Sequence, residues 1–149
     1  MHARPDRPAP MLPVVLDTNA VLDWQVFQDA RSPGLWQALD TGRLRWHATP
    51  EMLAELADVL TRPLGPRWDD RRERALTEDR MPGVALSAPP GQTEHRLRCA
   101  DPDDQKFIDL ALHLPARWLI TRDRALLRLK RQAAARGLAI LLPEHWPGA

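Results

Sequence analysis

The apolar positions along the chain fall into short runs that alternate with longer amphipathic stretches. Runs of three to five mainly apolar residues, each bounded by polar or turn-forming residues, predict strands rather than helices because they are so short. The predicted strands lie at residues 12–16, 44–48, 84–86, 118–121 and 138–142.

The stretches between these runs carry apolar residues at helical spacing. Thr49, Pro50 and Glu51 supply an N-cap, a first-turn proline and a first-turn acid for one helix, and Gly137 ends another. Residues 68–80 are mostly charged with both signs mixed, which is typical of a solvent-facing helix. The predicted helices lie at about 19–30, 35–40, 50–61, 68–80, 101–114 and 124–136.

Strands that alternate with helices indicate an α/β domain with a mainly parallel sheet. In such sheets, functional side chains lie beyond the carboxyl ends of the strands. Asp17 directly follows the first apolar run, and Asp123 lies just past the run at 118–121. We therefore expect both carboxylates at the functional edge of the sheet.

Helical periodicity points two further acids towards the interior. Asp104 precedes three apolar positions of its helix by three, four and seven residues, which places it in line with the apolar face, whereas Asp103 is off that line. Glu55 lies at the rim of the apolar stripe of the helix at 50–61. A carboxylate on an inward face needs a cation or hydrogen-bond donors, or it becomes neutral.

Each of these acids also has a local explanation. Asp17, Asn19 and Asp123 are suitable helix caps, and a glutamate at the rim of a helix is usually solvated. The local explanations leave open why the acids converge, and Asp104 on its inward line is not explained by them. Carboxylates that meet in one cleft are suited to hold Mg²⁺ or Mn²⁺. Such ions assist the hydrolysis of phosphodiesters.

Composition limits the alternatives without selecting one. The 149 residues are enough for one domain, with 44% hydrophobic and 28% charged residues and a formal net charge of +1. The single cysteine, Cys99, excludes an internal disulfide and a cysteine zinc site, which fits a reducing compartment such as the cytoplasm. No segment is apolar enough to span a membrane. Residues 1–11, rich in proline and charge, are expected to form a disordered tail before a domain at 12–146.

Four segments together resemble the PIN-domain nucleases. They are VVLDTNAVL, PEMLAELADVL, DPDDQKFIDLAL and WLITRD, which occur in the order and at the spacing of that family. The resemblance covers about residues 12–146 and is strongest to bacterial PIN proteins described as toxins of toxin–antitoxin systems. It implies a three-layer α/β/α fold with a mainly parallel sheet of four to five strands, an acidic site for Mg²⁺ or Mn²⁺, and cleavage of single-stranded RNA.

The resemblance also assigns roles to individual residues. It implies four catalytic acids, three of which would be metal ligands, with two polar residues in support. The catalytic acids are Asp17, Glu55, Asp104 and Asp123; the metal ligands among them are Asp17, Asp104 and Asp123; the supporting residues are Asn19 and Thr121. One position departs from the family pattern, because many relatives have glycine where this chain has Arg122. A bulky cation there is expected to contact phosphate or to alter metal occupancy.

Partners are expected at two surfaces. Residues 122–136 contain six basic residues and one acid, so Arg122, Arg124 and Arg128 are candidates for RNA contact, although a plain solvated helix face explains the pattern as well. The resemblance to toxins implies a small antitoxin protein that covers the acidic groove. It leaves a homodimer open, and no membrane partner is expected.

Two other functions remain as alternatives. A PIN module that has lost catalysis and binds RNA or a protein partner would keep the fold. An aspartyl-phosphate phosphatase of the haloacid-dehalogenase type would need a second aspartate two residues after Asp17, where Asn19 stands. The chain has no glycine-rich phosphate loop that would indicate a nucleotide hydrolase.

Overall fold

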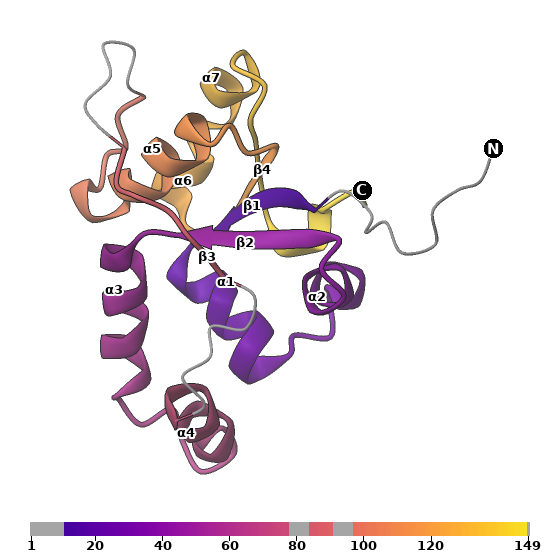
Figure 1. The fold of residues 1–149 in the computed structure, drawn as a ribbon, viewed down its shortest axis with the longest axis vertical. Coiled ribbons are helices and arrows are strands. Elements are labelled where there is room, and N and C mark those ends of the chain that lie inside the picture. Colours follow the sequence, from indigo (N-terminus) through magenta and orange to yellow (C-terminus); the bar gives the residue numbers. More distant parts are fainter. Residues whose placement is uncertain (1–10, 78–83, 91–96, 149) are drawn as a thin grey trace, which may run out of the picture.

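The computed structural model describes residues 11–77, 84–90 and 97–148, and this part of the chain is built around one five-stranded sheet (Figure 1). Every neighbouring pair of strands is parallel, and the order is β3-β2-β1-β4-β5. The predicted α/β fold is therefore confirmed. The strands are β1 (Leu12–Leu16), β2 (Leu44–Ala48), β3 (Ala85–Leu86), β4 (Trp118–Ile120) and β5 (Ala139–Leu141). The expected tail lies outside the described residues except for Met11.

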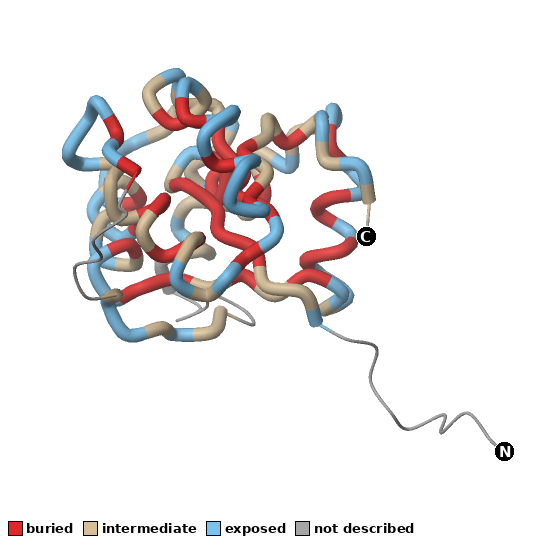
Figure 2. Tube along the Cα trace, turned by 90° about the horizontal axis from the view of Figure 1, so that it is seen from above, coloured by how far each residue is buried: buried red, intermediate tan, exposed pale blue. Residues whose placement is uncertain are grey.

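The core lies around β1, the central strand. Val14 and Val15 are completely buried because β1 has a strand on each side and helices over both faces. Val14 is in register with Trp46 of β2 and Trp118 of β4, and both tryptophans are buried. Figure 2 shows the buried positions gathered in the interior, with exposed positions on the outer turns.

Helices cover the sheet on two sides, which gives a three-layer α/β/α architecture. In Figure 1, α5, α6 and α7 lie above β1 and β2, and α1 to α4 lie below them. The α-helices are α1 (Thr18–Leu22), α2 (Pro33–Asp40), α3 (Pro50–Leu60), α4 (Asp69–Thr77), α5 (Gln105–His113), α6 (Arg124–Leu127) and α7 (Lys130–Ala134). The other helical turns are a π-helix, η1 (Asp23–Phe27), and two 3-10 turns, η2 (Pro102–Asp104) and η3 (Pro143–His145).

The helix expected at 101–114 begins as the 3-10 turn η2 and continues as α5. Two other predicted helices differ more. The helix expected at 19–30 is α1 followed by the π-helical η1, and it ends at Gln28, which has a left-handed backbone with φ 49°. The helix expected at 124–136 is divided into α6 and α7, because the Leu129 N–H bonds to the Leu126 carbonyl in a tighter turn. Both differences come from turn geometry that apolar periodicity does not reveal.

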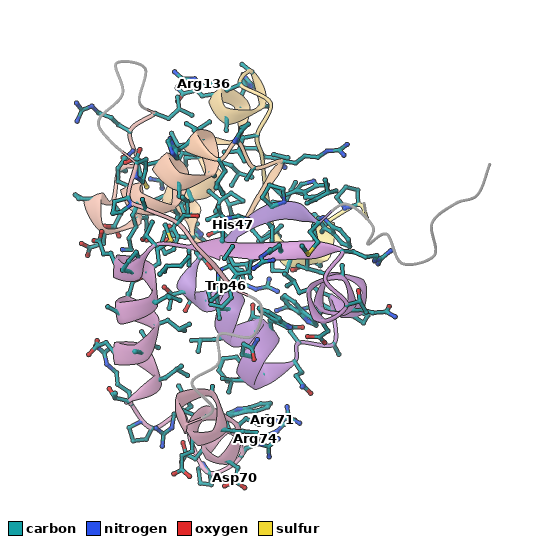
Figure 3. All side chains as sticks on the ribbon, viewed as in Figure 1. Trp46, His47, Asp70, Arg71, Arg74 and Arg136 are labelled. Atoms are coloured by element: carbon teal, nitrogen blue, oxygen red, sulfur yellow. The ribbon has the colours of Figure 1, made fainter. Side chains whose placement is uncertain are left out.

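The charged segment at 68–80 forms α4 as far as Thr77, and residues 78–80 lie outside the described part. Asp70 and Arg74 are exposed, as predicted, and Figure 3 shows them at the end of the molecule formed by α4. Arg72 is different, because its Nη1 donates to the Leu60 carbonyl at 2.8 Å and joins α4 to the end of α3. Within the described residues, no helix is long and apolar enough to cross a membrane.

Candidate active site

Asp17 lies at the end of β1 and is almost completely buried, with 4% of its surface exposed. Its Oδ1 caps α1 by accepting a hydrogen bond from the Ala20 backbone N–H at 2.8 Å. Its Oδ2 accepts a hydrogen bond from the Thr121 hydroxyl. Thr121 follows β4, and its Oγ1 also accepts a hydrogen bond from the Asp123 N–H at 2.9 Å. Thr121 therefore joins the ends of β1 and β4 and links the first predicted acid to the last.

Asp123 and Asp104 are both N-terminal to helices. Asp123 caps α6, with its Oδ1 accepting a hydrogen bond from the Ala125 N–H at 2.7 Å. Asp104 ends η2 and precedes α5, and its Oδ2 is buried without a hydrogen-bond partner among the described residues. Asp103 beside it is exposed, so the inward direction expected for Asp104 is observed. An unpartnered buried carboxylate oxygen has a desolvation cost that a bound cation would remove.

The carboxylates of Asp17 and Asp104 both have raised pKa values, and the nearby Asp123 contributes to each rise. Burial raises the pKa of Asp17 to about 6, against the opposing effect of the hydrogen bonds from Thr121 and Ala20, and the charge of Asp123 adds to the rise. Burial likewise raises the pKa of Asp104, and the neighbouring Asp123 carboxyl raises it further. Burial and a neighbouring carboxylate disfavour the charged forms of Asp17 and Asp104, and a bound cation would compensate that cost.

Glu55 lies on α3, at the other side of this region, and is half-buried. One of its oxygens accepts a hydrogen bond from the Thr18 hydroxyl at 2.5 Å, and the other is 3.2 Å from the Lys106 ammonium. Lys106 also donates to the Asp103 carbonyl. Both oxygens of Glu55 are therefore oriented by the residue that follows Asp17 and by the residue two positions after Asp104.

The other predicted site residues lie in different surroundings. Asn19 is exposed, and no hydrogen bond joins its side chain to Asp17 in the described part of the chain. Arg124 and Arg128 are exposed at the two ends of α6. The Arg122 guanidinium forms ion pairs with acids of other segments. The role of these three arginines in RNA contact stays a prediction.

The donor set fits a hard divalent cation, since it consists of carboxylate oxygens with a threonine hydroxyl in support. Asp17, Asp104 and Asp123 are the residues that would hold it, and the buried unpartnered oxygen of Asp104 is the observation in favour. As the side chains stand, no group of three or more His, Cys, Asp or Glu residues in the described ranges has the geometry of a formed metal site.

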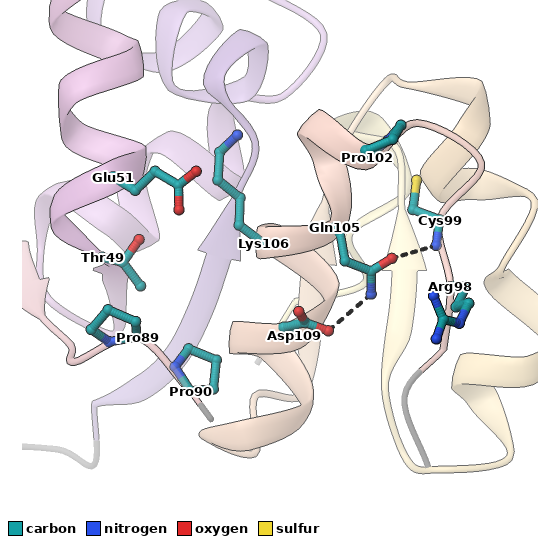
Figure 4. A pocket seen from close by; sticks show the side chains of 10 residues that line it. All are labelled: Thr49, Glu51, Pro89, Pro90, Arg98, Cys99, Pro102, Gln105, Lys106 and Asp109. Carbon is teal, nitrogen blue, oxygen red and sulfur yellow. Dashed lines mark hydrogen bonds between the residues drawn. The ribbon is translucent and has the colours of Figure 1, made fainter. Parts of the chain in front are cut away.

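A cavity of about 480 Å³ adjoins the acidic region between the start of α3 and α5 (Figure 4). Lys106 lines this cavity and also contacts Glu55, so it marks the boundary between the two. Gln105 is fixed in the cavity wall, because its Oε1 accepts from the Cys99 N–H at 2.7 Å and its Nε2 donates to Asp109 at 2.9 Å. The cavity wall also contains Thr49, Glu51, Pro89, Pro90, Arg98 and Pro102.

Three residues near the predicted acids have side-chain contacts that the sequence did not indicate. Thr18 bonds to Glu55, Lys106 pairs with the same carboxylate, and Asp23 pairs with Arg122 at 2.9 Å. Lys106 offered one signal, since it is one of only two lysines among 21 basic residues. Asp23 gave none, because its partner is 99 positions away in the sequence.

A parallel α/β sheet with carboxylates gathered beyond its strand ends defines a class of proteins with an acidic cleft suited to divalent cations. Comparison with protein families shows which family of that class this chain matches. Residues 13–125 match the family model described as PIN domain. The match covers most of the chain, which therefore belongs to the PIN domain family. PIN domains are generally nucleases and typically use divalent metal ions. No curated protein matches the chain.

Proposed function

We propose that this protein is a metal-dependent endoribonuclease that hydrolyses phosphodiester bonds of single-stranded RNA in the cytoplasm. The observation that carries the proposal is the acidic region itself. Asp17 is held by Thr121, Asp104 has a buried unpartnered oxygen, and Asp123 lies close enough to raise the pKa of both. Membership of a nuclease family supports the same reading.

The three aspartates would hold Mg²⁺ or Mn²⁺, which when bound stabilises the phosphate oxygens and activates water for an in-line displacement. Thr121 orients Asp17 by donating its hydroxyl hydrogen to Oδ2, while Ala20 occupies Oδ1. Glu55 is oriented separately by Thr18 and Lys106, and this arrangement suits a carboxylate that accepts a proton from the attacking water. Lys106 also places a positive charge beside the region that the phosphate would enter.

We further propose that the protein is the toxin of a toxin–antitoxin pair, held inactive by a small protein that covers the acidic groove. The support is the resemblance of the four sequence segments to such toxins, together with the cavity that adjoins the acidic region and is lined by Lys106. We expect a short gene for a DNA-binding protein next to the gene for this chain. The product of that short gene should stop RNA cleavage by the purified protein. A product that binds without affecting cleavage would contradict the pairing.

Cleavage of a mixed single-stranded RNA by the purified protein tests the enzyme activity. The reactions contain Mn²⁺, Mg²⁺ or EDTA, and the variants are Asp17→Asn and Asp104→Asn. Asp103→Asn is the matched control, because Asp103 adjoins Asp104 but its side chain is exposed. We expect cleavage with either metal, none with EDTA, and a loss of at least about 100-fold in the two site variants.

The control variant is expected to cleave like the parent protein. If the parent cuts no RNA with any metal, while it still binds RNA or a protein partner, the chain is a PIN module without catalysis. Equal cleavage by Asp104→Asn and the parent would remove Asp104 from the proposed metal site.

A further inference from the structure

Arg122 lies between two residues of the acidic region, Thr121 and Asp123, but its side chain bonds elsewhere. Its Nε is 2.9 Å from Asp23 Oδ2, and its Nη1 is 3.1 Å from Glu144 Oε2. Its Nη2 is 2.9 Å from Glu144 Oε1 and 3.4 Å from Asp29 Oδ2. The guanidinium thus pairs with three carboxylates and is only 24% exposed.

The contact with Asp23 is the one that reaches back to the site. Asp17 is the N-cap of α1 and Asp23 is its C-cap, so these two acids mark the two ends of one short helix. Thr121 bonds to Asp17, and Arg122 bonds to Asp23. Consecutive residues after β4 therefore bond to both ends of α1. Two bonds at separate points restrict rotation of one segment against the other, which a single bond does not.

We propose that Arg122 is a positioning residue, which holds the turn carrying Asp123 in a fixed orientation to the helix capped by Asp17. The proposal rests on the proposed function. The guanidinium suits this role because its planar fork forms several directed bonds at once, whereas a lysine ammonium has no such geometry.

The neighbouring Arg31 provides a comparison within the same cluster. Arg31 Nη2 is 2.6 Å from Asp29, and Arg31 Nη1 is 3.6 Å from Glu144, so it shares two of the three acids. Its side chain is 60% exposed, and no hydrogen bond or ion pair joins it to Asp23 among the described residues. Arg31 therefore carries the same charge into the same cluster without bonding to α1.

The sequence suggested a different role for Arg122, direct contact with RNA phosphate. The ion pairs with Asp23, Asp29 and Glu144 occupy most of the guanidinium donors. A phosphate contact would have to break these pairs, and it would act on substrate binding rather than on the arrangement of the acids. The two roles therefore differ in what they change, KM and salt dependence for phosphate contact and kcat for positioning.

The experiment compares Arg122→Lys, Arg122→Gln and Asp23→Asn with Arg31→Gln as the matched control. The first measurement uses metal-free protein and follows hydrogen exchange of the Asp123 and Ala125 amides, which bond to Thr121 Oγ1 and Asp123 Oδ1. The second measures kcat and KM for RNA cleavage. We expect all three site variants to exchange these amides at least about 10-fold faster than the parent, with Arg31→Gln unchanged.

We also expect kcat to fall at least about 10-fold in the same three variants while KM changes little, since small displacements of reacting groups are costly. Arg122→Lys keeps the charge, so parent-like exchange and kcat in that variant would overturn the proposal. A raised KM with a weaker salt dependence and parent-like exchange would overturn it in favour of phosphate contact. If the parent protein cleaves no RNA, the proposed function fails, and the exchange measurement still decides whether Arg122 holds the turn.

Discussion

At the scale of single residues, the capping role and the site role of an aspartate are compatible. Asp17 uses Oδ1 to cap α1 and presents Oδ2 to Thr121, and Asp123 uses only Oδ1 to cap α6. A carboxylate has two oxygens, so a local role leaves one for another partner. The sequence could place both acids at strand ends, but it could not decide between cap and ligand, because the same residue type suits both.

Burial of Asp17 without a cation is expected to lower the stability of the metal-free protein above pH 6. Its pKa rises from 3.8 to about 6 on folding, so the folded state binds the proton more tightly than the unfolded state. The contribution of protonated Asp17 to the free energy of unfolding is therefore complete below pH 4 and is lost as the pH rises through about 6. A shift of this size corresponds to about 3 kcal/mol.

Asp17→Asn should therefore unfold at a higher temperature than the parent at pH 8 in EDTA, and the difference should shrink towards pH 5. Thermal unfolding followed by circular dichroism at a series of pH values measures this. The exposed Asp58→Asn serves as control, because its carboxylate is 67% exposed. A parent protein that is more stable than Asp17→Asn at pH 8 in EDTA would contradict the assigned burial cost.

At the scale of elements, the strands were more predictable than the helices. Each predicted strand contains an observed strand, because an apolar run between turn residues is a local signal. The helix at 19–30 was predicted too long, since the helical segment ends at Gln28 with a left-handed backbone that apolar periodicity does not reveal. The ion pair between Lys106 of α5 and Glu55 of α3 joins residues far apart in the sequence, and so does the ion pair between Arg122 and Asp23. Such pairs could not be derived from one sequence without the fold.

The exposed arginines of α6 are expected to contribute to RNA binding through phosphate contact. Arg124 begins α6 and Arg128 is its C-cap, four positions on, so the two side chains lie on one face of this helix. We expect Arg128→Gln to weaken RNA binding and to reduce the slope of log K against log salt by about 0.7, the value for one phosphate of a single strand. Arg43→Gln is the control, since Arg43 is exposed beside the amino-terminal end of β2. An equal slope in Arg128→Gln and the parent would assign this face to solvent.

At the scale of the whole molecule, the strand order explains why the acids meet. The chain passes from β1 to β2 and β3 on one side and then crosses to β4 and β5 on the other. The direction of winding therefore reverses between β1 and β4, and a ligand site in a parallel sheet lies at such a switch point. Asp17 follows β1, and Thr121 and Asp123 follow β4. The alternation of elements predicted the edge of the sheet, but only the observed order shows that these two strands are neighbours.

The acids of the site come from segments around residues 17, 104 and 123, so the unfolded chain cannot bring them together. A cation bound only by the folded state stabilises it by about 2.7 kcal/mol when its concentration is 100 times Kd. We expect Mn²⁺ to raise the unfolding temperature of the parent protein by several degrees, or about 2–4 °C for each kcal/mol. Differential scanning calorimetry with Mn²⁺ and with EDTA measures the shift.

Asp104→Asn should lose most of this rise, because it replaces a carboxylate whose buried oxygen has no other partner among the described residues. Asp103→Asn should keep it, since that side chain is exposed one position away. The comparison separates a cation held by the assembled site from one bound loosely by surface acids. An equal rise in the parent and in Asp104→Asn would show that Mn²⁺ stabilises the protein from another location, whatever the RNA cleavage assay finds.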